Sequence, residues 1–155
     1  MWTVDGRTQR TELLGSLAAE RVLYEFDGPR IFTSRTTEGA LLLAYLCDQD
    51  GEVDRFLVAP ANEDELEQLE RGALPVREAL TRSWLWVVDR GRDGTLMHAW
   101  DCSGLALPAD VLPAPGTPLL PQHVQRPIGS RFDADRRAQF RRAQDVVQQK
   151  GLWAA

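Results

Sequence analysis

Four carboxylates stand close together in the segment LCDQDGEVDRF, and they could bind a metal ion. They are Asp48, Asp50, Glu52 and Asp54. Clustered carboxylate oxygens are the ligands that Ca²⁺ and Mg²⁺ prefer, so the loop could support a metal-dependent hydrolase. However, the spacing is not that of an EF-hand, and the glutamate of its twelfth position is missing. We therefore interpret the loop as the solvated tip of a β-hairpin and expect no metal or other cofactor.

The residues that could bind zinc or act as nucleophiles do not form a known motif. The candidate zinc ligands are Cys47, His98, Cys102 and His123, and they contain no CxxC or HxxxH pair. A Cys102–His98 dyad would need the fold to aim the two side chains at each other. The sequence also lacks a G-x-S-x-G elbow around Ser103, a P-loop and a GxGxxG motif. We therefore expect a non-catalytic protein in which both cysteines are buried thiols.

Three tryptophans are the candidate residues for binding a ligand or a partner. Trp84 and Trp86 share one face of a predicted strand, and Trp100 lies on the strand expected to pair with it. We favour a cross-strand aromatic cluster that fills a small core. The alternative is an exposed aromatic platform for a peptide or a ring-shaped ligand, because tryptophan is enriched at binding hot spots. That alternative would make the protein a small-ligand sensor.

The charges of the chain are divided between two regions. The net charge is -5, and residues 48–70 contain nine acidic residues and one arginine. From Arg126 onwards there are seven basic and three acidic residues. We expect Arg137 and Arg141 to face a protein partner or a second copy of the chain. The broad basic surface that nucleic-acid binding requires is missing, so we do not expect DNA or RNA as a partner.

The pattern of apolar residues and turns predicts a single α+β domain. Asp50-Gly51 between two apolar runs indicates a hairpin, and Asn62 before three acidic residues indicates a helix start. We expect a mostly antiparallel sheet of about five strands and a packed helix pair at 63–71 and 76–80. An amphipathic helix is expected at 11–23. The expected divisions are an N-terminal extension or short helix (1–21), an α+β core (22–113), a Pro-rich strap (114–130) and a C-terminal helix (131–150).

Several short motifs resemble a family of small uncharacterised bacterial domains. They are YEFDGPRIF, LLAYLCD, RFLVAP, ELEQLERGALPVREAL and WLWVVD, and the resemblance spans about residues 22–113. The resemblance implies a cytoplasmic accessory or regulatory domain and brings no catalytic residues with it. No apolar run approaches the roughly 20 residues that span a bilayer. We therefore expect a protein-interaction module of a bacterial cytoplasmic system, for example an accessory or toxin-neutralising protein.

Overall fold

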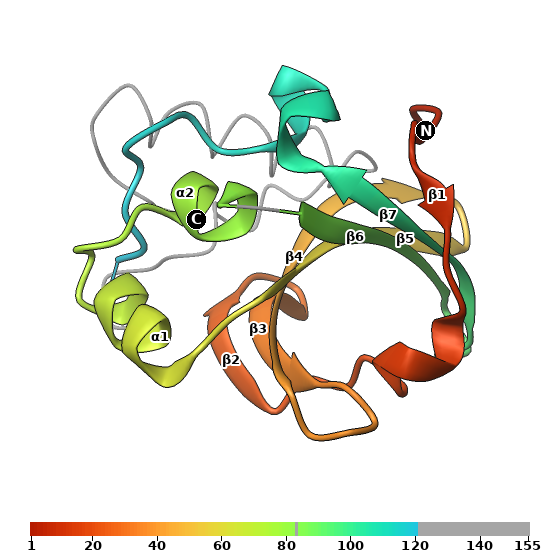
Figure 1. Ribbon diagram of the computed structural model, residues 1–155, viewed down its shortest axis with the longest axis horizontal. Helices are drawn as coiled ribbons and strands as arrows, with labels where there is room; N and C mark the ends of the chain where they lie inside the picture. Colours follow the sequence, from red (N-terminus) through yellow and green to blue (C-terminus); the bar gives the residue numbers. More distant parts are fainter. Residues whose placement is uncertain (83, 121–155) are drawn as a thin grey trace.

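The computed structural model describes residues 1–82 and 84–120, which form an α+β domain around a seven-stranded antiparallel sheet. The strand order is β1-β7-β6-β5-β4-β3-β2, so every strand from β2 to β7 lies beside its neighbours in sequence (Figure 1). The strands are β1 (Arg7–Thr8), β2 (Arg21–Glu25), β3 (Pro29–Arg35), β4 (Leu41–Asp50), β5 (Val53–Pro60), β6 (Trp84–Gly91) and β7 (Leu96–Ser103). The predicted α+β class with a mainly antiparallel sheet is confirmed, with more strands than expected.

Two short α-helices connect β5 to β6. They are α1 (Glu63–Glu70) and α2 (Val76–Thr81). The side chain of Asn62 accepts a hydrogen bond from the backbone N–H of Glu65 at 2.8 Å, which is the predicted N-cap. Three 3-10 helices complete the described structure: η1 (Thr11–Leu14), η2 (Gly104–Ala106) and η3 (Ala109–Val111). None of the described helices is long and apolar enough to cross a membrane.

The sheet buries apolar side chains on both faces. It curls strongly, with α1 and α2 outside the curl and the N-terminal segment across its open side (Figure 1). The outer face packs against both helices and the chain that follows β7, through Leu66, Leu69, Val76, Leu80, Val111, Leu112 and Leu119. The inner face packs against η1 and the residues after it, through Leu14 and Leu17. A side chain therefore meets a different core depending on which way it points from its strand.

The apolar residues of the strands predict that the buried side chains of the sheet include Leu43, Tyr45, Phe56, Val58, Trp86 and Val88, and all of them except Trp86 are buried. Leu43, Tyr45, Phe56, Val58 and Val88 are each 0–1% exposed. Trp86, which was expected in the core, is only half-buried at the margin of the inner cluster. On β6 the inner cluster contains Val88, and Trp86 lies two residues nearer the start of the strand, at the edge of that cluster.

The helix expected at 11–23 is wrong. A single 3-10 turn is formed by η1, and it ends at Gly15, where φ is +62°. Leu17 also has a positive φ of +51°, so the chain cannot continue as a right-handed helix. Leu14 and Leu17 are buried because this segment crosses the inner face of the sheet, and β2 begins four residues after Leu17.

The acidic hairpin is tighter than the sequence suggests. Asp50 pairs with Val53, so Gly51 and Glu52 alone form the turn, and φ of Gly51 is +60°. Most of the supposed loop is therefore paired strand. The predicted C-terminal helix 131–150, with Arg137 and Arg141, lies outside the described residues, as do most of the strap at 114–130 and His123.

Candidate functional site

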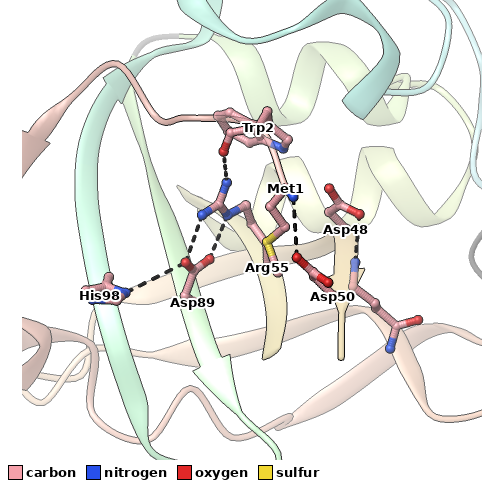
Figure 2. A network of polar contacts seen from close by, with 8 residues as sticks. Met1, Trp2, Asp48, Asp50, Arg55, Asp89 and His98 are labelled. Carbon is pink, nitrogen blue, oxygen red and sulfur yellow. Dashed lines mark hydrogen bonds and ion pairs between the residues drawn. The ribbon is translucent and has the colours of Figure 1, made fainter. Parts of the chain in front are cut away.

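A row of four ionisable residues crosses the sheet on its outer face. Asp48 on β4 pairs with Arg55 on β5, Arg55 pairs with Asp89 on β6, and Asp89 pairs with His98 on β7. Because residues directly opposite each other in a sheet point to the same face, the four side chains form one line. Figure 2 shows this polar row beneath the first residues of the chain. Of the four, Asp48, Arg55 and Asp89 are each 5% exposed.

The centre of the polar row is a buried two-pronged ion pair. Arg55 donates from Nε and Nη2 to the two carboxylate oxygens of Asp89 at 2.6 and 2.8 Å (Figure 2). Its Nη1 donates to the backbone carbonyl of Trp2. The guanidinium carbon also lies 4.8 Å from the Trp2 ring and 5.3 Å from the Trp100 ring. Burial opposes the charge of Arg55, but the hydrogen bond and charge of Asp89 outweigh it and raise the pKa of the guanidinium.

His98 at the end of the polar row is not placed to act as a general base. Its Nδ1 lies 3.8 Å from Oδ2 of Asp89, which is beyond hydrogen-bonding distance, and the side chain is 56% exposed. Both carboxylate oxygens of Asp89 already accept from Arg55. Trp100 stands between His98 and Cys102 on the same face of β7, with its ring 5.3 Å from that of His98. The structure therefore does not bring Cys102 and His98 together as a dyad.

The four carboxylates of the hairpin have different environments. Asp48 is buried in the polar row, which contradicts its predicted place on a solvated tip. Asp50 contacts the N-terminal ammonium of Met1 at 3.4 Å, Asp54 accepts from Gln49 at 2.9 Å, and Glu52 lies in the turn. Asp48 and Asp50 point to one face of the hairpin, whereas Asp54, which pairs with Gln49, points to the other, so the four carboxylates do not converge. Within residues 1–82 and 84–120, no group of three or more His, Cys, Asp or Glu side chains could hold a metal ion.

The three candidate tryptophans are split between the two faces of the sheet. Trp86 pairs with Asp101, whereas Trp100 pairs with Val87. Trp100 therefore packs against the outer core and Trp86 against the inner core. The expected three-tryptophan cluster is wrong because it requires a β6–β7 register shifted by one residue. The rings of Trp84 and Trp86 do meet, edge to face, with centroids 4.5 Å apart and planes at 83°.

A shallow pocket of about 560 Å³ lies beside the exposed indole of Trp84. We call it the Trp84 pocket, and its lining residues are Arg7, Trp84, Asp101, Cys102 and Ser103. Trp84 is 44% exposed, which is unusual for so large an aromatic side chain. Three strands position the lining, because Asp101 on β7 pairs with Trp86 on β6 and with Arg7 on β1.

Cys102 lines the Trp84 pocket, but its side chain belongs to the outer core together with Trp100. Burial raises the pKa of the Cys102 thiol, and the charges of Asp101 and Asp5 raise it further against an opposing effect of Arg55. Cys47 and Cys102 are both buried thiols outside any disulfide, as predicted.

Sequence patterns identify only part of this pocket. The tryptophan at its wall was found, but Arg7 and Asp101 were not. The strand that brings Arg7 there has two residues, which is too short for any periodic signal. The glycine at position 6 is the sequence feature that fits this close approach of β1 to β7. A Cβ atom there would lie 2.5 Å from Sγ of Cys102 and 2.7 Å from the carbonyl oxygen of Asp101.

The comparisons with known proteins place part of the chain in a family. No curated protein and no solved structure matches the chain. Residues 8–84 match a family of unknown function, DUF6575, which confirms the resemblance to an uncharacterised domain family. The matched region runs from the end of β1 to the first residue of β6 and leaves β7 outside. Residues 8–84 of the chain are thus a domain of the family of unknown function DUF6575.

Proposed function

We propose that the protein is a non-catalytic interaction module that binds a protein partner through the surface around Trp84. The observation that carries this proposal is the exposure of Trp84 beside the half-buried Trp86. Tryptophan supplies a large rigid contact area and is enriched at the energetic centres of protein interfaces. The polar groups of Arg7 and Asp101 beside the rings resemble the mixed apolar and polar make-up of such interfaces.

The charge of the described body favours a basic partner. Residues 1–120 contain 20 of the 23 acidic residues and 11 of the 18 basic residues, a formal charge of -9. An acidic protein attracts basic proteins over distances comparable to the Debye length and selects against acidic ones. This supports an accessory or regulatory role in the bacterial cytoplasm, for example neutralising a basic toxin. A second copy of the chain is an alternative basic partner, because it contains seven basic residues from Arg126 onwards.

Quantitative affinity capture from the native cell tests the proposal. Full-length wild type, Trp84→Ala and Met97→Ala serve as baits, because Met97 is similarly exposed (48%) near the opposite end of β7. We expect at least one stoichiometric protein to be lost from the Trp84→Ala bait and retained by Met97→Ala. Light scattering of the same three forms identifies self-association. A partner set that is the same for all three baits, with no change in oligomeric state, would contradict the proposal.

Small-ligand sensing is a second candidate function, and it uses the same pocket. A volume of about 560 Å³ is within the range of small-molecule sites. Its open shape and the absence of an enclosing apolar wall favour the protein partner. A metabolite extract that changes the fluorescence of wild type but not of Trp84→Phe would support the sensor instead.

A further inference from the structure

Asp101 lines the Trp84 pocket, and its side chain is 28% exposed. Gln9 donates from Nε2 to Oδ2 of Asp101 at 3.2 Å, and Nη2 of Arg7 lies 3.7 Å from the same oxygen. The other oxygen, Oδ1, has no hydrogen-bond partner in the part of the chain that the structure describes. A carboxylate can accept two parallel hydrogen bonds from a guanidinium group. Asp101 therefore has the capacity to receive an incoming cation.

Arg7 holds this carboxylate only loosely. Its side chain is 82% exposed, and its distance of 3.7 Å to Asp101 is too long for a hydrogen bond. Exposed ion pairs of this kind contribute little because water screens them. An incoming cation that also contacts an aromatic ring can therefore displace Arg7 from Asp101.

The indole of Trp84 provides that second contact. Its exposed ring lines the same pocket as Asp101, and the faces of tryptophan rings attract guanidinium groups. Arginine suits such a site better than lysine, because its planar group can stack on a ring while it donates sideways to a carboxylate. The protein already uses this combination elsewhere, since Arg55 contacts the Trp2 and Trp100 rings and a carboxylate together.

The pocket belongs to an acidic molecule. Among its lining residues Asp101 and Arg7 carry opposite charges, and Asp5 lies two residues before Arg7 in the chain. The described body as a whole has a formal charge of -9, which is complementary to a basic ligand.

We propose that the Trp84 pocket binds an arginine side chain of the partner protein, which stacks on Trp84 and donates to Asp101. The inference rests on the proposed function, because it names the group by which the partner is recognised. Arg7 is then a competitor for Asp101 rather than a ligand-binding residue. The proposal therefore predicts that removing the side chain of Arg7 strengthens binding of the arginine.

Fluorine NMR of the full-length protein labelled with 5-fluorotryptophan tests this proposal. The signal of Trp84 is assigned with Trp84→Phe, and capped hexa-arginine, hexa-lysine and hexa-glutamate peptides are the probes. We expect hexa-arginine to shift the Trp84 signal, hexa-lysine to do so more weakly, and hexa-glutamate to have no effect. The signals of Trp2 and Trp100 on the other face should stay in place, which also shows that each variant is folded.

Three variants distinguish binding in the pocket from nonspecific attraction to the negative charge of the protein. Asp101→Asn should weaken hexa-arginine binding by about tenfold, because a charge-assisted hydrogen bond is lost. Asp64→Asn on the exposed face of α1 removes an equal charge elsewhere and should change binding less than about twofold. Arg7→Gln should strengthen binding by about two- to threefold, the size of a weak surface ion pair.

The outcomes that overturn the proposal are distinct from failure of the proposed function. Equal weakening by Asp101→Asn and Asp64→Asn, or binding of hexa-glutamate that needs Arg7, would overturn the arginine site. So would an unchanged Trp84 signal with hexa-arginine, even if affinity capture finds a partner that depends on Trp84. If the peptide results hold but no such partner is captured, the arginine site stands and the proposed function fails.

Discussion

Arg55 and Asp89 form the most deeply buried ion pair among the described residues. Both side chains are less than a tenth exposed, and two hydrogen bonds join them. The carbonyl of Trp2 and two aromatic rings also surround the guanidinium, so its charge has several partners inside the protein. Replacing both residues of such a pair with apolar side chains often changes the free energy of unfolding little. Removing one partner lowers it strongly, because the other charge stays buried without a counter-ion.

Asp89→Asn tests this reading of the polar row. The substitution keeps the shape of the side chain but leaves the buried charge of Arg55 without its counter-ion. We expect the free energy of unfolding to fall by about 3–5 kcal/mol, measured by urea denaturation. Glu12→Gln is the control, because the side chain of Glu12 is 73% exposed in a surface ion pair. A loss within about 0.5 kcal/mol, as for ordinary surface substitutions, would show that the pair is dispensable.

Residue types alone could predict some of these environments. The cysteines were correctly expected to be buried thiols, because Cys behaves as a small apolar residue. Asp48 was misplaced on a solvated tip, because a run of carboxylates next to Gly51 looks like a turn. Its burial depends on Arg55, which lies opposite it only after β4 and β5 pair around a bulge between Leu46 and Asp48.

The pairing of β6 with β7 decides which tryptophans come together. Trp86 and Asp101 are partners, so Trp84, Trp86 and Asp101 share one face while Trp100 lies on the other. The sequence predicted both strands, but it carries no signal for their register, since both strands bury residues on both faces. The Trp84 pocket could not be predicted from the sequence for the same reason, and because the two-residue β1 shows no periodicity.

Alanine substitutions at the two tryptophans separate packing from binding. Trp86 packs against the inner core, so Trp86→Ala should lower the free energy of unfolding by about 1–3 kcal/mol, less than for a fully buried aromatic residue. Trp84→Ala should cost less than about 1 kcal/mol, because 44% of the residue is already exposed. Thermal and urea denaturation of both variants provide the comparison. A larger loss for Trp84→Ala would make Trp84 a structural residue and remove the main support for a binding surface.

At the scale of the whole molecule, the N-terminal segment closes the inner face of the sheet. Leu14 and Leu17 are 1% and 0% exposed, and Arg90 on β6 donates to the carbonyl of Leu17 at 2.9 Å. The sequence predicted residues 1–21 as an N-terminal extension or a short helix, and Gly15 weakened the helical alternative. A strongly curled sheet leaves an apolar inner face that only a separate segment can cover, and this requirement appears only in three dimensions (Figure 1).

Leu17→Ala tests whether this closure is part of the fold. Removing a fully buried leucine side chain should lower the free energy of unfolding by about 2–5 kcal/mol. Leu13→Ala is a matched control, since Leu13 belongs to the same segment but is 47% exposed, and it should cost less than about 1 kcal/mol. Equal and small effects of the two substitutions in urea denaturation would mean that the segment is an appendage.

The central proposal is that the protein binds its partner through the surface around Trp84. Site-specific photo-crosslinking in the native cell tests this most directly, with benzoylphenylalanine at position 7, which lines the Trp84 pocket and leaves Trp84 in place, and, as a control, at the exposed position 97. We expect position 7 to capture one basic protein, or a second copy of the chain, and position 97 not to do so. Crosslinks of equal yield and identity at both positions, or a specific product only at position 97, would contradict it.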